Sequence, residues 1–405
     1  MTNILISGGS VAGSALAFWL RRHGFTPTVV ERAPALRTGG YKIDVRGAAL
    51  EVVDRMGLRE EVARHGTDMR IARFVDATGR QRATMSAELF GGREGDDVEI
   101  MRGDLARILH DATRDDVEYL FDDSVTALEE TADGVRVTFE NAPPRTFDLV
   151  VGADGLHSNV RALAFGAESS YVHDLGHYIS ICTVPNHLGL DRTEMMHPAP
   201  GRSAGMYSTA RGADATAMFL FASPPLAYDR KDVAGQRALL AEVFAGQGWE
   251  VPRLLDAAAG APDFYFDSIS QVRMDRWSSG RVVLVGDAAY GPSPASGQGT
   301  SLALVGAYVL AGSLAAAGGD HRAAFAAYED DLRHFVEENQ KLAPANLKGM
   351  VLKSAAQIRF QMFLLRLMPY LPGRDTMIKR VTEPIRTAAT AITLKDYGRA
   401  SSSAS

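Results

Sequence analysis

Six residues near the start of the chain, GGSVAG from Gly8 to Gly13, have the composition and spacing of a phosphate-binding turn. An apolar segment at residues 4–6 precedes the turn, and a helical pattern over residues 12–23 follows it. Glycine lets backbone N–H groups approach a pyrophosphate, and a helix N-terminus presents unpaired donors and the positive end of a dipole. The segment therefore predicts a nucleotide phosphate site, with Ser10 where G-x-G-x-x-G has its middle glycine.

A carboxylate follows this turn at the distance expected for a ribose contact. Glu31 closes a predicted strand over residues 27–30 and lies 18 residues beyond Gly13. At this spacing in a βαβ unit, a carboxylate accepts hydrogen bonds from a ribose. Arg32 comes directly after it. The alternative is a plain turn between a strand and a helix, but the flanking pattern favours a unit that binds adenosine.

A second signal of the nucleotide type, Gly286-Asp287-Ala288, follows a predicted buried strand over residues 282–285. By itself this short pattern is more typical of a surface turn. It lies about 280 residues after the first signal, so a single adenine dinucleotide held from both ends of the chain is the simplest explanation.

The composition excludes several classes of function. Of the 405 residues, 46% are hydrophobic and 23% are charged, the usual balance of a soluble globular protein. A net charge of -6 without a Lys/Arg run disfavours a nucleic-acid partner, so we expect small-molecule partners. Cys182 is the only cysteine, which excludes an internal disulfide framework and indicates a reducing, cytoplasmic location. No metal is expected, because four histidines lack metal-ligand spacing: His173, His177, His187 and His197.

Two apolar segments in the second half of the chain bear on membrane association. Residues 301–317 only reach the lower limit of spanning length and follow a glycine-rich loop, so we expect a buried helix and no membrane span. Residues 350–368 contain Lys353, Arg359 and Arg366, which make a span unfavourable. Their apolar positions predict packing on the body of the protein. Alternatively, these residues form a dimer interface or a wall of the substrate pocket. We therefore expect a monomer or a homodimer.

The remaining pattern predicts an α/β protein with an inserted β-rich block. Helices are predicted over residues 48–65, 103–112 and 233–244, and from residue 298 to about 369. Strands are predicted over residues 71–75, 81–84, 98–101, 117–120, 125–128, 135–139, 149–151, 178–184 and 216–221.

Further sequence motifs follow one another in an order that is typical of one protein family. They are Arg102 within residues 101–105, Asp154 within residues 150–161, Asp287 within residues 285–289, and the glycine-rich residues 292–299. Together with the first turn and Glu31-Arg32, these segments resemble the class A FAD-dependent aromatic hydroxylases, which are single-component flavoprotein monooxygenases. The resemblance extends from residue 1 to about residue 340.

This resemblance implies a fold and two cofactors, FAD and NADPH. A Rossmann-like FAD-binding domain would comprise residues 1–68, 98–170 and 276–340. A β-rich, mixed-sheet substrate-binding domain would comprise residues 69–97 and 171–275, followed by a C-terminal helical segment, residues 341–395. Asp287 would accept a ribityl hydroxyl. The helix that begins at residues 297–299 would direct its N–H groups at the flavin, whose negative charge on reduction a helix dipole stabilises.

A closer resemblance, to the tetracycline-inactivating branch of this family, lies in residues 36–44. It implies that Arg37 meets NADPH and Asp44 meets FAD, with a solvated loop charge as the alternative for Arg37. Arg102 would join the FAD contacts, and Asp154 would contact both cofactors. The complete set of predicted cofactor-binding residues is Gly8, Ser10, Gly13, Glu31, Arg32, Arg37, Asp44, Arg102, Asp154, Asp287, Pro294, Gly297, Gln298 and Gly299.

The implied reaction is an NAD(P)H- and O₂-dependent hydroxylation of an aromatic or polyketide-like small molecule through a C4a-hydroperoxyflavin. An antibiotic of the tetracycline or rifamycin type is one candidate substrate. Tyr290 stands where the family often has histidine, so no imidazole role is carried over and no catalytic residue is assigned. Two alternatives remain: an FAD-binding sensor or interaction protein without turnover, and an FAD-dependent epoxidase or reductase.

Overall fold

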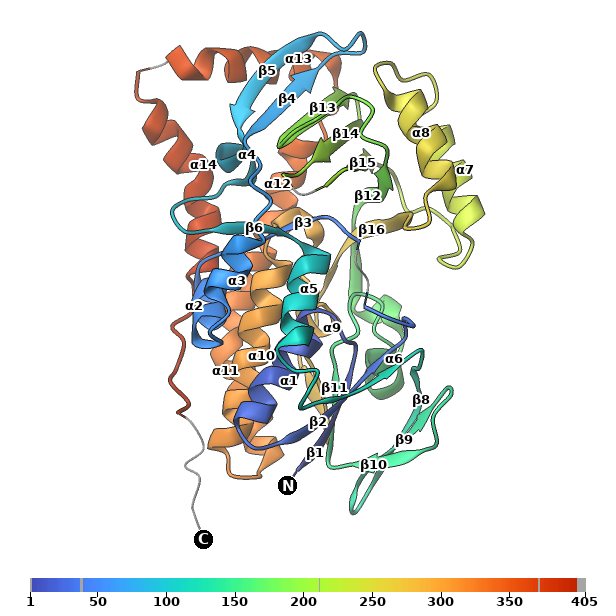
Figure 1. Ribbon diagram of the computed structural model, residues 1–405, viewed down its shortest axis with the longest axis vertical. Helices are drawn as coiled ribbons and strands as arrows, with labels where there is room; N and C mark the ends of the chain where they lie inside the picture. Colours follow the sequence, from blue (N-terminus) through green and yellow to red (C-terminus); the bar gives the residue numbers. More distant parts are fainter. Residues whose placement is uncertain (1, 37–38, 211, 371, 399–405) are drawn as a thin grey trace.

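A six-stranded sheet forms the base of the nucleotide-binding part, in a computed structural model that describes residues 2–36, 39–210, 212–370 and 372–398 (Figure 1). Its strands are parallel except for β17 at one edge. Their order is β17 (Ser278–Ser279), β18 (Val282–Leu284), β11 (Leu149–Gly152), β1 (Asn3–Ser7), β2 (Thr26–Glu31) and β7 (Glu118–Phe121). Strands β1, β11 and β18 are almost wholly buried, as expected of a parallel sheet covered on both faces.

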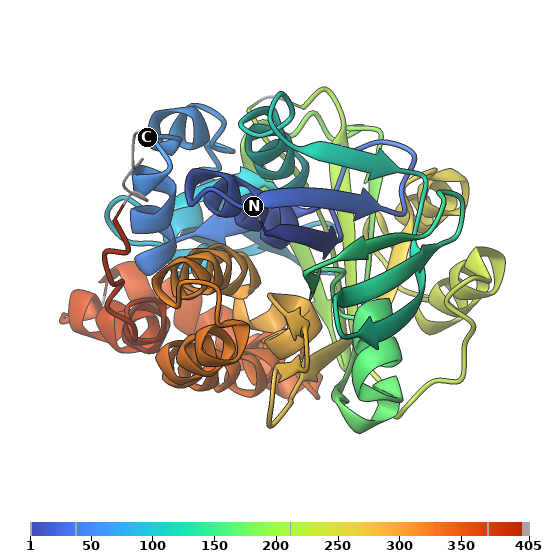
Figure 2. The same cartoon turned by 90° about the horizontal axis from the view of Figure 1, so that it is seen from below.

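Helix α10 (Gly299–Ala316) is the central helix of the molecule. It packs against α1 (Val11–Arg22) and α11 (His321–Gln340), and Figure 2 shows α10 and α11 side by side in orange. Among the described residues, α10 alone is long and apolar enough to cross a membrane, and 78% of it is buried inside the protein. The prediction of a buried helix is therefore confirmed.

A seven-stranded mixed sheet makes up the second layer. Its order is β16 (Tyr265–Val272), β12 (Val172–Val184), β15 (Ala215–Ala222), β14 (Arg202–Ser208), β13 (Thr193–Ala199), β4 (Ile71–Val75) and β5 (Gln81–Ser86). Helices α7 (Val233–Val243) and α8 (Val251–Gly260) share a hydrophobic core with one face. The opposite face packs on α12 (Leu342–Met350) and on Ala295, so it is the face turned toward the predicted cofactor residues.

Two smaller sheets complete the strands. An antiparallel pair, β3 (Lys42–Val45) and β6 (Val98–Met101), lies between the two layers. A three-stranded sheet contains β8 (Val125–Thr131), β9 (Gly134–Phe139) and β10 (Arg145–Phe147). The other helices are α2 (Ala48–Arg55), α3 (Arg59–Arg64), α4 (Ala87–Gly91), α5 (Arg102–Asp111), α6 (Asn159–Phe165), α9 (Asp287–Tyr290), α13 (Ala355–Leu367) and α14 (Arg374–Ala389).

The structure corrects two sequence-based predictions. The single helix over residues 48–65 is wrong, because α2 and α3 are separated at Gly57, whose positive φ of 76° terminates α2. The prediction that the C-terminal apolar residues pack on the body of the protein is wrong for one face of α13, since Phe360 and Phe363 are exposed, although Met362 is buried. Strands β13 and β14 and helix α8 were not predicted.

Tyr290, at the position where a histidine was considered, is fully buried and points into the core. The Tyr328 hydroxyl lies 2.9 Å from the Tyr290 hydroxyl and donates to the carbonyl oxygen of Leu284 at 3.0 Å. A Cβ on Gly306 of α10 would lie 1.9 Å from the Tyr290 hydroxyl oxygen. The phenol of Tyr290 therefore occupies the space that a side chain at position 306 would need.

We predict that Gly306→Ala lowers the free energy of unfolding by about 1–3 kcal/mol, because overpacking forces the neighbouring groups apart. Tyr290→Phe removes the clashing oxygen, so the double variant should regain most of the loss. Gly349→Ala in α12 is the matched control, since a Cβ there meets nothing within 4 Å. Chemical denaturation measures all four proteins, and an unaltered Gly306→Ala variant would contradict the packing argument.

Candidate functional site

Three chain segments meet at the carboxyl ends of β1, β11 and β18. A Cβ on Gly8 would lie 2.5 Å from the carbonyl oxygen of Ala153, and a Cβ on Gly13 would lie 1.8 Å from the carbonyl oxygen of Gly8. A Cβ on Gly286 would lie 3.0 Å from the Cβ of Ala12. The first turn is therefore in close contact with both later motifs, as a single nucleotide site requires.

Glu31 fastens the glycine-rich turn to the end of β2. Its Oε2 atom accepts a hydrogen bond from Gly9 N at 2.8 Å, and its Oε1 atom accepts one from Ala33 N at 2.9 Å. A carboxylate has about four acceptor positions, so both oxygens retain capacity for a ribose hydroxyl. Arg32 is exposed next to it.

Arg102 reaches the turn from the start of α5. Its Nη2 atom donates to the Ser10 hydroxyl at 3.1 Å, and its backbone N–H donates to the Tyr41 carbonyl oxygen at 3.1 Å. Ser10 occupies the N-cap position of α1 without capping that helix through its side chain. The first N–H groups of α1 and the Arg102 guanidinium thus form a cationic corner suited to phosphate.

Asp287 has a carboxylate without a hydrogen-bond or ion-pair partner among the described residues. Burial raises the pKa of this carboxyl, and the Arg102 guanidinium opposes that effect. Asp287, Pro294 and Gly297 nevertheless retain accessible surface, although the residues immediately before and after each of them are buried. We infer that these three residues line a recess inside the fold.

Gln298 is fully buried, yet its Oε1 and Nε2 atoms have no hydrogen-bond partner. The buried Ser301 hydroxyl, one turn into α10, has none either. Gly297 has a positive φ of 67°, and a Cβ there would meet nothing within 4 Å. Unpaired buried polar groups are costly, so donors and acceptors at this helix N-terminus indicate a site for a polar ligand.

Two predicted residues are engaged elsewhere, and a third is not among the residues that the structure describes. Asp154 follows β11, but its Oδ2 atom accepts hydrogen bonds from Asn159 N at 2.8 Å and Val160 N at 3.0 Å. Its carboxylate therefore caps α6. Asp44 forms ion pairs with Arg93, at 3.4 Å, and with Arg46. Arg37 lies outside the described residues.

A titratable cluster that sequence reasoning missed connects the two layers. His157 follows β11, and its Nε2 atom lies 2.8 Å from Oδ2 of the buried Asp267 on β16. Its Nδ1 atom lies 3.1 Å from Oε2 of Glu168. The Tyr265 hydroxyl donates to Asp267 Oδ2 at 3.0 Å, and the Tyr228 hydroxyl donates to Oδ1 at 3.2 Å. Although burial lowers the pKa of His157, hydrogen bonds to the two carboxylates raise it more.

Arg161, quoted in the second motif but assigned no role, is fully buried. Its Nη1 atom donates to the Ala288 carbonyl oxygen at 2.9 Å, and its Nη2 atom donates to the Leu156 carbonyl oxygen at 2.6 Å. It therefore joins α6 to α9, the helix that begins at Asp287. The sequence offered one signal for this residue, an arginine in a short motif after a strand. It did not reveal the hydrogen-bond partner, Ala288, which lies 127 residues away.

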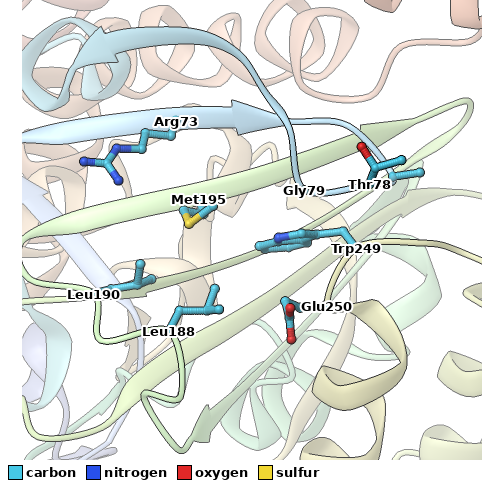
Figure 3. A pocket seen from close by; sticks show the side chains of 9 residues that line it. Arg73, Thr78, Gly79, Leu188, Leu190, Met195, Trp249 and Glu250 are labelled. Atoms are coloured by element: carbon cyan, nitrogen blue, oxygen red, sulfur yellow. The ribbon is translucent and has the colours of Figure 1, made fainter.

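A separate pocket of 380 Å³ lies on the other face of the seven-stranded sheet (Figure 3). Leu188, Met195 and Trp249 surround it and pack against the core beneath α7 and α8. None of the predicted cofactor residues lines this pocket. It is therefore distinct from the recess at Asp287.

Comparison with known proteins identifies the family of the chain. Residues 1–205 and 265–343 match the FAD binding domain family. The chain belongs to the FAD-binding monooxygenase family. An uncharacterised protein from Mycobacterium tuberculosis is 50% identical over 351 residues, covering 86% of this chain and 94% of that protein. A flavin-dependent monooxygenase from Legionella longbeachae is 41% identical over 338 residues, covering 84% and 87%.

The structural comparison agrees with this assignment. The crystal structure of tetracycline destructase Tet(51) matches with a TM-score of 0.86 and 35% identity, covering 98% of this chain and 100% of that one. The protein is a flavin-dependent monooxygenase, and its predicted family and mixed α/β fold are confirmed.

The residues of this monooxygenase suit FAD. The glycine-rich turn with Arg102 offers donors for a pyrophosphate, and Glu31 offers acceptors for a ribose. Near the N-terminus of α10, Gln298 and Ser301 have buried polar atoms without a hydrogen-bond partner, and the Asp287 carboxylate is accessible. This distribution of donors and acceptors follows the chemistry of an elongated dinucleotide.

We predict that Asp287→Asn weakens FAD binding about tenfold to a hundredfold, because a hydrogen bond to a charged group contributes roughly 1.5–3 kcal/mol. Titration of the apoprotein with FAD, followed by flavin fluorescence, measures this change. Asp115→Asn on the exposed surface is the matched control and should bind FAD like the wild type. Wild-type affinity in Asp287→Asn would contradict the assigned position of the cofactor.

We also predict a pH-dependent contribution of His157 to stability. Its pKa is raised in the folded protein above about 6.5 for the unfolded chain, so the contribution is complete below that value. The difference in unfolding free energy between wild type and His157→Gln should therefore decline as pH rises through the folded pKa. Exposed His173→Gln is the control and should show no such trend. A difference that grows from pH 6 to 8 would refute the predicted sign.

Proposed function

We propose that this monooxygenase uses NADPH and O₂ to hydroxylate an aromatic or polyketide-like molecule, with a tetracycline-type antibiotic as the first candidate. The balanced reaction consumes NADPH, a proton, O₂ and the substrate, and yields NADP⁺, water and the hydroxylated product. FAD, when bound, supplies the redox chemistry and the activation of O₂. The protein must bind and orient the reactants and exclude water.

The observation that carries the proposal is the accessible surface of Asp287, Pro294 and Gly297 between buried neighbours, from which we infer the recess. The charges of Arg102 and Asp267 act on both Tyr41 and Tyr265, so these two phenols lie close to this region. Burial raises the pKa of Tyr41, with Arg102 opposing this effect and the negative charges of Asp287 and Asp267 adding to it. Tyr41 is therefore near all three charged groups, and aromatic rings at this position favour a flat, apolar substrate.

The sheet supplies the apolar side of this recess. Ile179, Ile181 and Leu220 form a hydrophobic cluster with Ala295, and Met218 packs against it. Tyr265 is 43% exposed at the beginning of β16, although burial raises the pKa of its phenol. An apolar surface with two phenols at its edge suits a polycyclic molecule that needs orientation more than charge recognition.

The name of Tet(51) supports the choice of tetracycline as the first candidate, since that destructase is similar along the whole chain. NADPH as electron donor and the cytoplasm as location are parts of the same proposal. Cys182 is buried and free, as expected for a reducing compartment.

The test uses the FAD-loaded enzyme with NADPH, O₂ and a panel of a tetracycline, a rifamycin and a simple phenol. We expect faster NADPH oxidation with a polyketide substrate, slower oxidation with NADH, and a product heavier by one oxygen atom. Mass spectrometry identifies the product. Hydroxylation of the simple phenol alone would overturn the polyketide assignment, and a product without added oxygen would indicate a reductase.

A further inference from the structure

Helix α13 presents an apolar stripe to solvent. Phe360 is 63% exposed and Phe363 58%, while Leu364 and Leu367 are each 39% exposed. These positions follow the i, i+3, i+4, i+7 spacing and therefore share one face of the helix. Met362 is the buried residue of α13. A surface helix normally turns its apolar face inward, so this orientation requires an explanation.

The charge of the surrounding segment is equally unusual. From position 339 to position 374 the sequence contains no Asp or Glu but six Lys or Arg residues, in a chain of net charge -6. The rest of the chain therefore carries a net charge of -12. Arg359 and Arg366, two turns apart on α13, are exposed and form no ion pair within the part of the chain that the structure describes.

The position of α13 suits contact with an extended surface. The helix packs on β5 and lies at one end of the longest axis of the molecule (Figure 1). At 13 residues it is about 20 Å long, too short to span a bilayer of about 30 Å. An amphipathic helix with aromatic residues on one face and cations beside them is typical of a segment that lies in the membrane interface.

We propose that α13 docks this protein on an anionic lipid bilayer. The side chains of Phe360, Phe363, Leu364 and Leu367 enter the boundary between headgroups and acyl chains, and Arg359 and Arg366 pair with lipid phosphates. Charge favours this occupant over a second copy of the chain. A two-fold contact through α13 would place the same cationic segments together, without an acidic residue between positions 339 and 374 to offset them.

The test is co-sedimentation of the FAD-loaded protein with vesicles of phosphatidylcholine alone or mixed equally with phosphatidylglycerol. We expect binding to the anionic vesicles, at least tenfold weaker binding to phosphatidylcholine, and release as salt rises from 0.1 to 0.5 M. Arg359→Gln should weaken binding about fivefold. Phe360→Ser with Phe363→Ser should weaken it at least tenfold.

Matched controls lie on other surfaces. Leu163→Ser and Val233→Ser replace residues that are 41% and 40% exposed, and Arg253→Gln replaces an exposed cation of α8. These variants should bind vesicles like the wild type, and retained FAD absorbance verifies folding of every protein. Equal binding to both lipids, equal losses in the controls, or no sedimentation would overturn the proposal. Light scattering that shows a dimer lost in Phe360→Ser would assign the surface to a second copy instead.

Discussion

The backbone of the glycine-rich turn lies so close to neighbouring backbone that Gly8 and Gly13 have no room for a side chain. The space beside Gly13 is filled by the Gly8 carbonyl, and the space beside Gly8 is filled by the backbone after β11. Because the strands end at one edge of a parallel sheet, this contact fixes where α1 begins and where α10 can lie. Backbone packing therefore determines the position of the predicted cofactor site, and the side chains around this site add specific contacts.

The part of the site predictable from sequence is the part specified locally. The strand, turn and helix around Gly8 and the motif at Asp287 each depend on a few adjacent residues. The junction of His157 with Asp267 was not predictable, because it depends on how two sheets are placed and joins residues 110 positions apart. Strands β13 and β14 were missed since their histidine, glycine and alanine positions obscure alternation. The break at Gly57 was missed because the helical periodicity continues through it.

The region between the two large sheets contains several ion pairs between mostly buried side chains. Lys42 on β3 lies 2.6 Å from Glu194 and 3.5 Å from Glu99, and Arg93 also pairs with Glu99. Each of these charges is mostly buried and has an opposite partner, which limits the cost of removing it from water. Such pairs join the β3–β6 ribbon to the seven-stranded sheet, so Asp44, with Arg46 and Arg93, has a structural role in addition to its predicted cofactor role.

The contact between Tyr290 and Gly306 also limits which residue types the two positions can hold together. They lie on different helices, α9 and α10, yet the Tyr290 hydroxyl fills the space that a side chain at position 306 would need. A relative with a smaller side chain at the first position is free to carry alanine or serine at the second, whereas this chain is not. The two positions are therefore sterically coupled, because in this chain a side chain at position 306 requires a smaller residue at position 290.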